Sequence, residues 1–426
     1  MFGKTELQKV LGNWIKNGGD LYDALRDLGD NQIKKKKDAL AVSAALRNIS
    51  IGEPITEYQI SSPLHSLTAF FQQVQSEAAY NELVSSGLPE LRRIFHEGLK
   101  YPENIEDDLM FILKILAMFQ QKEDALLVFE TARKGFNSDG FMWSLILGTF
   151  DKDHPHWKII LDGLRKPLPN DFLCIAYLDF VNGHAINDGL KDHPFDATEG
   201  IERLRIWLED NNEENFSYAH SAAAAIPFLN KNHRDLLLEV AQKHFDNGVK
   251  IEAAWAMAKI GDRQGIENLE KWAIDVNHSS VACRYLRELG FEDEIPTKAL
   301  EDDFQAMAEM ADWLSHPNEF GKPPDNIELF DTRVLFWPPT GDKRKVWLFN
   351  YSYEPHEKDE ERDAGIAMVG SITFALFGEA TENLKPEEVY GLHCAWELEM
   401  NNSPILKETR NSQVGLKILR KYNEDL

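Results

Sequence analysis

Apolar residues recur at helical spacing from Thr5 to about residue 317, and this periodicity limits the fold more than any other feature of the chain. Between Leu109 and Ala117, for example, apolar side chains recur every three or four residues and so share one face of a helix. Clusters of Gly, Pro, Asn and Asp separate the helical segments, and short connections favour antiparallel helix pairs. We therefore predict a mainly α-helical protein built from successive helix pairs.

Two windows of this helical region repeat one pattern after about 29 residues, which lies within the period range of helical repeat proteins. The first window contains Ala253, Ala254, Ile260, Gly261, Asp262, Ile266 and Leu269. The second has Ala282, Leu289 and Gly290 at equivalent positions, but Cys283 replaces the second Ala and Phe291 replaces the Asp. A weaker copy lies upstream, with Ala222–Ala225 and with Asn230 in place of the Gly.

Each position of the pattern has a structural role. Gly261 is expected to end one helix in the left-handed conformation, and Asp262 is expected to cap the next helix. Ile260 and Leu269 are expected to be buried between consecutive helix pairs. Loss of either apolar side chain would then weaken the core of the repeat.

This pattern resembles the HEAT-like repeats first named for phycobilisome lyases, on the residues from Ala253 to Leu269 given above. The resemblance covers about residues 220–296 and implies an α-solenoid of antiparallel helix pairs. Unrelated activities use such arrays, so the fold alone does not indicate a function. No residue specific to a lyase accompanies the pattern, and we therefore do not expect bilin attachment.

The pattern changes after residue 317 to strand-like runs, which predict a hairpin of Arg333–Trp337 and Val346–Tyr351 and a third strand within Ile366–Phe377. Helices are expected to begin at Pro386 and to end the chain. We therefore divide the chain into an N-terminal helical region (1–105), HEAT-like helical repeats (106–317) and a small C-terminal α+β domain (318–426). The apolar face of the helix before residue 317 predicts that this domain packs against residues 297–315.

The chain is strongly acidic, with 71 Asp and Glu against 46 Lys and Arg and a formal net charge of -25. This charge opposes binding to phosphate backbones, so we expect no nucleic-acid partner. The densest basic run, Lys34–Lys37, is interpreted as the solvated start of a helix. The N-terminus lacks an apolar signal segment and no window approaches the about 20 apolar residues that span a bilayer. We therefore expect a cytoplasmic protein that does not bind membranes.

Three cysteines, Cys174, Cys283 and Cys394, lie far apart among apolar residues, which indicates buried, reduced thiols. The adjacent His393 and Cys394 cannot converge on each other along a helix or strand, so we interpret both as structural. The segment from Asp151 to His156 combines carboxylates and imidazoles, but its position between helices favours turn and capping roles. We therefore predict no catalytic residue, no cofactor and no metal site.

Binding to another protein is the function that these features favour. Six residues are candidates for contact with a partner: Glu209, Asp210, Glu213, Glu214, Trp337 and Trp347. The four acidic residues precede an Ala-rich helix, and the acidic segment 357–363 is a second candidate. Because complementary charge accelerates association, we expect a non-catalytic scaffold or adaptor with a basic partner. Two alternatives stay open: an acidic inhibitor or immunity-type protein that blocks a basic enzyme, and an enzyme whose site lies between the repeats and the C-terminal domain.

Overall fold

The computed structural model describes residues 4–26, 28, 33–49, 51, 62–101, 105–316, 319–354, 363–377, 384–424 and 426. The protein is mainly helical with one small antiparallel sheet, as the periodicity predicts. The chain forms two compact units, Met1–Ala241 and Gln242–Leu426. The expected boundaries at residues 105 and 317 are not tested by this division and stay predictions.

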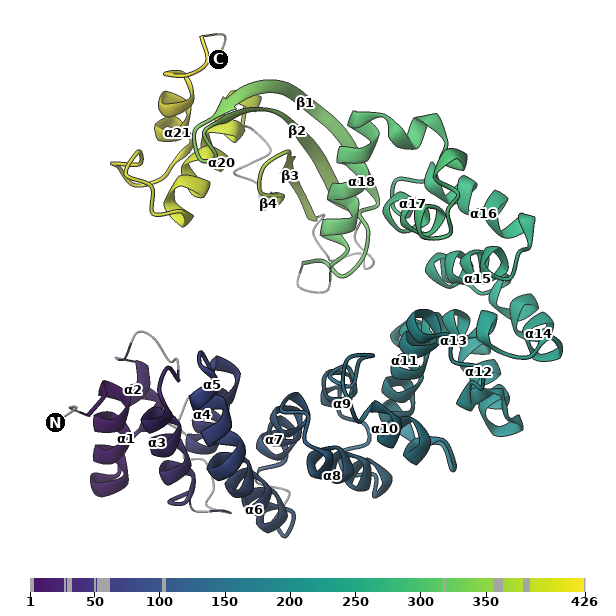
Figure 1. Ribbon diagram of the computed structural model, residues 1–426. Coiled ribbons are helices and arrows are strands. Elements are labelled where there is room, and N and C mark those ends of the chain that lie inside the picture. Colours follow the sequence, from purple (N-terminus) through teal and green to yellow (C-terminus); the bar gives the residue numbers. More distant parts are fainter. Residues whose placement is uncertain are drawn as a thin grey trace. The chain divides into compact units, whose positions relative to one another are not determined.

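The regular elements described in the first unit are helices, joined by turns and loops that include an isolated bridge between Ile33 and Val74 (Figure 1). Its α-helices are α1 (Glu6–Asn17), α2 (Leu21–Arg26), α3 (Lys36–Leu46), α4 (Pro63–Ala69), α5 (Glu77–Glu82), α6 (Leu88–Gly98), α7 (Glu106–Met118), α8 (Lys122–Arg133), α9 (Met142–Leu147), α10 (Trp157–Leu164), α11 (Asp171–Asp188), α12 (Thr198–Glu209), α13 (Phe216–Ala225) and α14 (Lys231–Ala241). The basic run Lys34–Lys37 does lie at the start of a helix, because α3 begins at Lys36, and most of its side chains are exposed.

The helices from α7 to α14 pack in a regular order. Each of α7, α9 and α11 contacts the next odd-numbered helix, so that α7, α9, α11 and α13 follow one another. The even-numbered helices α8 and α10 also contact each other, as do α12 and α14. Within pairs, α7 contacts α8 and α12 contacts α13. The odd-numbered helices therefore form one continuous row, and the even-numbered helices form two pairs, α8 with α10 and α12 with α14.

The second unit begins with α15 (Asn247–Lys259), α16 (Arg263–Ala273), α17 (Ser279–Glu288) and α18 (Asp302–Leu314). Gly261 follows α15 with a φ of 89°, as predicted. The Gly261 N–H donates to the carbonyl of Ala258 and the Asp262 N–H donates to that of Met257, each over 3.0 Å, which is the hydrogen-bond pattern of a Schellman motif. The Asp262 carboxylate then accepts from the Gln264 N–H over 3.0 Å and caps α16, also as predicted.

The two repeat windows share this helix ending but differ in the segment after it. Gly290 has a φ of 81°, and the Phe291 N–H donates to the carbonyl of Leu286 over 2.8 Å. Phe291 offers no side-chain acceptor where Asp262 has one, and two 3-10 turns, Glu292–Glu294 and Thr297–Leu300, come next instead of an α-helix. The window that has Phe291 in place of the Asp therefore also has 3-10 turns in place of the second α-helix.

The expectation for Ile260 was wrong, whereas Leu269 is fully buried as expected. Ile260 is only half-buried, because it lies beyond the last residue of α15 in the turn that leads to Gly261. The core between α15, α16 and α17 is filled instead by residues within the helices, among them Ala254, Ala258, Ile266 and Leu286.

The sheet follows α18 and has four antiparallel strands in the order β1 (Asn326–Trp337), β2 (Asp342–Tyr353), β3 (Asp363–Val369) and β4 (Phe374–Phe377). The β1–β2 hairpin occupies the predicted position. The third strand-like run, Ile366–Phe377, forms strands as predicted, but a turn at Gly370 divides it into the end of β3 and β4. Gly370 makes the turn with a φ of 108°, and a Cβ at this position would clash with the carbonyl oxygen of Lys345.

Helices cover both faces of this sheet (Figure 1). On one face, Phe349, Tyr351 and Tyr353 of β2 pack against α18 through Ala306, Met310 and Leu314. The C-terminal region therefore packs on residues 297–315, as predicted. The other face packs on α20 (Pro386–Met400) and α21 (Ser412–Leu419), and its buried residues include Leu335, Trp337, Val346, Leu348, Tyr390, Cys394 and Leu419.

Candidate functional site

A pocket in the first unit lies where the start of α11, the end of α12 and the start of α13 meet. We call it the aromatic pocket and define it by its lining residues: Asp139, Asp171, Phe172, Arg203, Ile206, Trp207 and Tyr218. Its volume is about 310 Å³. This volume is at the lower end of the range for ligand sites and suits one or two side chains of a partner.

Three aromatic rings form the wall of the pocket. The ring centre of Tyr218 lies 6.3 Å from that of Phe172 and 6.3 Å from that of Trp207. All three rings are half-buried, and Ile206 beside them is 52% exposed. An accessible group of aromatic and aliphatic side chains is typical of the residues that contribute most to binding at protein interfaces.

The charges of the pocket favour a cation. Arg203 is engaged within the unit, because its guanidinium donates to Asn170 Oδ1 over 3.2 Å and to Glu199 Oε1 over 3.3 Å. Asp139 and Asp171 are exposed, and Asp171 accepts a hydrogen bond from the Ser138 hydroxyl. The two carboxylates therefore present negative charge beside rings whose faces also attract cations.

The predicted acidic residues lie next to this pocket in the chain. Glu209, Asp210, Glu213 and Glu214, here called the acidic turn, connect the helix that carries Trp207 to the helix that carries Tyr218. Glu213 and Glu214 are exposed in a 3-10 turn. Glu209 forms an ion pair with Arg205 over 3.0 Å, and Asp210 accepts from Asn215 Nδ2 over 2.8 Å. Within the acidic turn, Glu213 and Glu214 are therefore the stronger candidates for contact with a partner.

The two predicted tryptophans differ. Trp347 is half-buried, its indole N–H donates to Asp303 over 2.8 Å and the Lys345 ammonium lies 4.9 Å from its ring centre. Its role in binding stays a prediction. The prediction that Trp337 contacts a partner was wrong, because Trp337 is fully buried between the sheet and α20. Alternation along a strand assigns side chains to the two faces of a sheet. It does not identify an exposed face here, because helices cover both faces.

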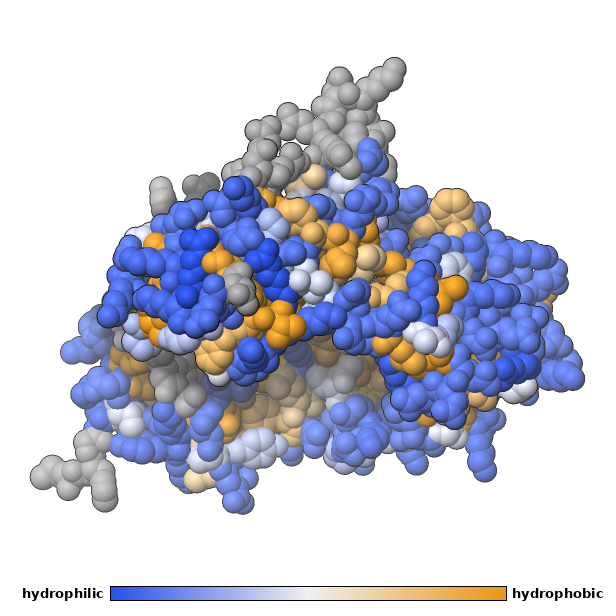
Figure 2. Space-filling model, turned by 90° about the horizontal axis from the view of Figure 1, so that it is seen from above, coloured by the Kyte–Doolittle hydropathy of each residue, from blue (hydrophilic) through white to orange (hydrophobic). Residues whose placement is uncertain are grey.

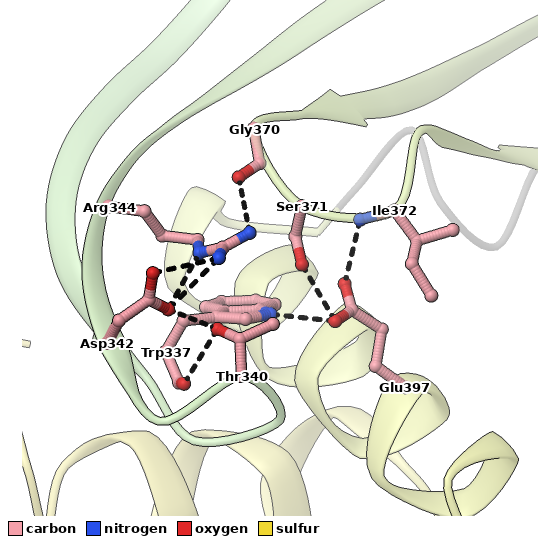
Figure 3. Close-up of polar contacts among 8 residues, drawn as sticks. All are labelled: Trp337, Thr340, Asp342, Arg344, Gly370, Ser371, Ile372 and Glu397. Carbon is pink, nitrogen blue, oxygen red and sulfur yellow. Dashed lines mark hydrogen bonds and ion pairs between the residues drawn. The ribbon is translucent and has the colours of Figure 1, made fainter.

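A buried carboxylate receives the indole N–H of Trp337 (Figure 3). Glu397 on α20 is 1% exposed and accepts from Trp337 Nε1 over 2.9 Å and from the Ser371 hydroxyl over 2.8 Å. Beside it, Arg344 pairs with Asp342 and donates to the carbonyl of Gly370 over 3.1 Å. These contacts fix the turn between β3 and β4 against α20, so this cluster has a structural role.

The other polar candidates are also structural. His393 and Cys394 are buried on α20, and burial lowers the pKa of His393 to about 3 and raises the pKa of Cys394 to about 12. Burial likewise raises the pKa of Cys174 to about 11. All three cysteines are buried free thiols, as predicted. Asp151 accepts from the backbone N–H groups of Asp153 and His154 and thus stabilises the predicted turn.

The surface in Figure 2 is mostly hydrophilic, and hydrophobic residues form separate patches on it. The second acidic candidate, residues 357–363, lies almost entirely outside the described residues, since only Asp363 is described. In the described part of the chain, no helix combines the length and apolar character needed to cross a bilayer. The same part contains no group of three or more His, Cys, Asp or Glu side chains arranged for a metal ion.

Sequence reasoning found the acidic turn but missed the pocket beside it. Trp207 and Tyr218 flank the acidic turn closely in the chain, and this proximity was an available signal. Phe172 lies at the start of another helix, and only tertiary packing brings it to Tyr218. No model of a protein family matches this chain, and no curated protein matches it in sequence.

Proposed function

We propose that this protein is a scaffold or adaptor that binds a basic segment of a partner protein at the aromatic pocket. The observation that carries the proposal is the coincidence of three accessible rings, two pocket carboxylates and the adjoining acidic turn. Among the described residues that line the pocket, Arg203 is the only cation, and it is already engaged by Asn170 and Glu199. A lysine or arginine side chain of the partner would meet negative charge and ring faces together.

The arrangement of α7 to α14 supports a HEAT-like solenoid as the scaffold. A continuous row of odd-numbered helices, with pairs of even-numbered helices in contact, is the packing expected of stacked helix pairs. The glycine-ended helices α15 and α17 add the sequence pattern on which the resemblance rests. In such arrays the ends and faces of neighbouring helices together form the binding surface. The aromatic pocket is likewise formed where α11, α12 and α13 meet.

The pocket is an anchor and not the whole interface. A volume of about 310 Å³ accommodates a few side-chain groups, whereas a stable protein interface buries about 1,200–2,000 Å². The partner is therefore expected to place one apolar or basic side chain in the pocket and to extend along neighbouring helices. The exposed Glu213 and Glu214 would then act mainly on the rate of association and on the choice of partner.

Selection from a display library of random linear peptides on the immobilised full chain tests this proposal. The enriched peptides should carry net positive charge and at least one aromatic or aliphatic residue. Ile206→Ser should abolish their enrichment, whereas Leu236→Ser should not. The two residues form a matched pair, because they are 52% and 48% exposed in the same unit. Enriched peptides without positive charge, or peptides that bind the Ile206→Ser variant equally well, would contradict the proposal.

A further inference from the structure

The three rings of the aromatic pocket are inclined to one another. The plane of the Tyr218 ring makes an angle of 56° with that of Phe172 and of 68° with that of Trp207. The three rings come from three different helices, α11, α12 and α13, and they line one pocket. Each ring is half-buried, so part of its surface stays accessible to a ligand. The rings therefore form inclined walls around a single space.

No cation of the chain itself covers these rings. Elsewhere in the protein, half-buried aromatic rings have a Lys or Arg over them, as in the pairs Lys158 with Trp157, Arg284 with Tyr285, and Lys345 with Trp347. In the described part of the chain, no Lys or Arg lies in this way over Phe172, Trp207 or Tyr218. The three ring faces are therefore available to a cation from outside the chain.

Arg203, the cation that lines the pocket, is directed away from the rings. Its Nη1 donates to the carbonyl of Pro169 and to Cys174 Sγ, and its Nη2 donates to Asn170 Oδ1 and Glu199 Oε1. These acceptors lie at the start of α11, in the segment before it and on α12. The guanidinium is therefore held by groups other than the three rings.

Two carboxylates supply negative charge beside the rings. Asp139 and Asp171 are both exposed and both line the pocket. Asp171 is fixed in place, because its carboxylate accepts from the Ser138 hydroxyl over 2.5 Å and the Leu173 N–H donates to the Ser138 carbonyl over 2.7 Å. A cation in the pocket is attracted by this charge even if it cannot donate a hydrogen bond.

The inclination of the rings distinguishes among the cations that a protein partner offers. The guanidinium of arginine is flat and stacks on one ring face or between parallel faces, which inclined rings do not provide. The ammonium of unmodified lysine is compact and strongly hydrated, so it needs acceptors that replace its water. A trimethylammonium group is nearly spherical, donates no hydrogen bond and contacts several inclined faces at once.

We propose that the aromatic pocket recognises a trimethylated lysine side chain of the partner and prefers it to unmodified lysine and to arginine. This inference rests on the proposed function, because it names the group that the partner places in the pocket. The trimethylammonium group contacts the faces of Phe172, Trp207 and Tyr218, and the alkyl stem lies beside the exposed Ile206. Methylation of the partner thereby controls its affinity for this protein.

NMR titration of the full chain with isotope-labelled Trp indoles tests the inference at the site itself. The chain has 10 Trp, and the indole signal of Trp207 is the one that Trp207→Phe removes. N-acetyl-trimethyllysine amide should shift this signal in a saturable way. N-acetyl-lysine amide, N-acetyl-arginine amide and the neutral isostere, with tert-butyl in place of trimethylammonium, should each bind at least about tenfold more weakly.

Two variants of Tyr218 test the role of the ring faces. Tyr218→Leu keeps an apolar side chain but removes the ring, so it should weaken binding of the trimethylated probe by about tenfold. The matched variant Tyr218→Phe keeps the ring and should bind within about twofold of wild type. Unchanged signals of the Trp indoles outside the pocket show that a variant is folded, and the comparison of the four probes on wild type needs no variant.

The inference is overturned if the trimethylated probe does not shift the Trp207 signal, if the neutral isostere binds equally well, or if Tyr218→Leu binds undiminished. It is also overturned if the lysine or arginine probe binds as tightly as the trimethylated one, although that result leaves the proposed function standing. Selection of peptides without positive charge contradicts the proposed function instead, whatever wild type prefers among these probes.

Discussion

The indole N–H of Trp337 at the end of β1 donates to the carboxylate of Glu397 in α20 over 2.9 Å, and both residues are buried. The same Glu397 oxygen accepts from the Ser371 hydroxyl over 2.8 Å, in the turn between β3 and β4. One carboxylate thus joins three separate segments of the C-terminal region. A buried donor that loses its acceptor costs more than the hydrogen bond contributed, so this contact is expected to be important for stability.

Glu397→Ala should lower the free energy of unfolding by about 2–4 kcal/mol, because it leaves the Trp337 and Ser371 donors without their acceptor in the core. Urea denaturation with Trp fluorescence measures this change. The control Glu399→Ala removes an exposed ion pair with Arg410 and should cost less than about 1 kcal/mol. Equal losses in the two variants would refute a structural role for the buried carboxylate.

Two glycine substitutions should change stability in opposite directions. Gly261→Ala should destabilise by about 1 kcal/mol, because φ is 89° at this position. Gly183→Ala should stabilise by about 0.5–1 kcal/mol, since it replaces an interior helical glycine at a position with open space. Thermal melting of both variants provides the comparison. The Schellman interpretation fails if Gly261→Ala melts at or above the wild-type temperature.

Buried His193 predicts a loss of stability in acid. Burial lowers the pKa of His193 from 6.5 to about 4 in the folded protein. The unfolded chain therefore takes up a proton below pH 6.5 that the folded chain refuses until about pH 4, so stability falls over this window as pH falls. The loss approaches about 3 kcal/mol at its largest.

Comparison of wild type with the His193→Asn variant measures the contribution of His193 to the loss of stability in acid. Asn can still accept the Phe195 N–H that His193 Nδ1 accepts over 3.3 Å, so the local cap is retained. Urea denaturation at several pH values between 6.5 and 4 should give a shallower pH dependence for the variant. Identical slopes for the two proteins would show that His193 does not cause the acid sensitivity.

Asp179 predicts a dependence of stability on pH. The raised pKa of its carboxyl means that the folded state disfavours the charged form, so its contribution to stability is present at low pH and is lost as pH rises through the folded-state pKa. Asp179→Asn should therefore raise the melting temperature at neutral pH, and this gain should disappear in acid. A variant that melts below wild type at neutral pH would contradict this account of Asp179.

Local signals explain which features could be predicted from the sequence. Gly261 and Asp262 define a helix end and a helix start within a few residues, and the β1–β2 hairpin likewise depends on adjacent segments. The burial predicted for Ile260 was wrong, because a shift of one residue moves a side chain from the buried interior of a helix to its half-buried C-cap. The partner contact predicted for Trp337 was wrong, because no local pattern in the sequence shows that helices cover both faces of the sheet.

The aromatic pocket depends on contacts between distant segments. Phe172 and Tyr218 meet through the packing of α11 on α13. Such pairs leave no periodic signal in one sequence.

The rate of association of an enriched basic peptide, measured by stopped-flow fluorescence at several salt concentrations, tests the central claim most directly. The rate for wild type should fall as salt shortens the Debye length below about 8 Å, and Glu213→Gln with Glu214→Gln should slow association and reduce this salt dependence. The control pair Glu77→Gln with Glu130→Gln removes the same charge from exposed positions of the same unit and should behave as wild type. A rate that does not respond to salt, or that is equal in the two double variants, would contradict recognition of a basic segment at the acidic turn.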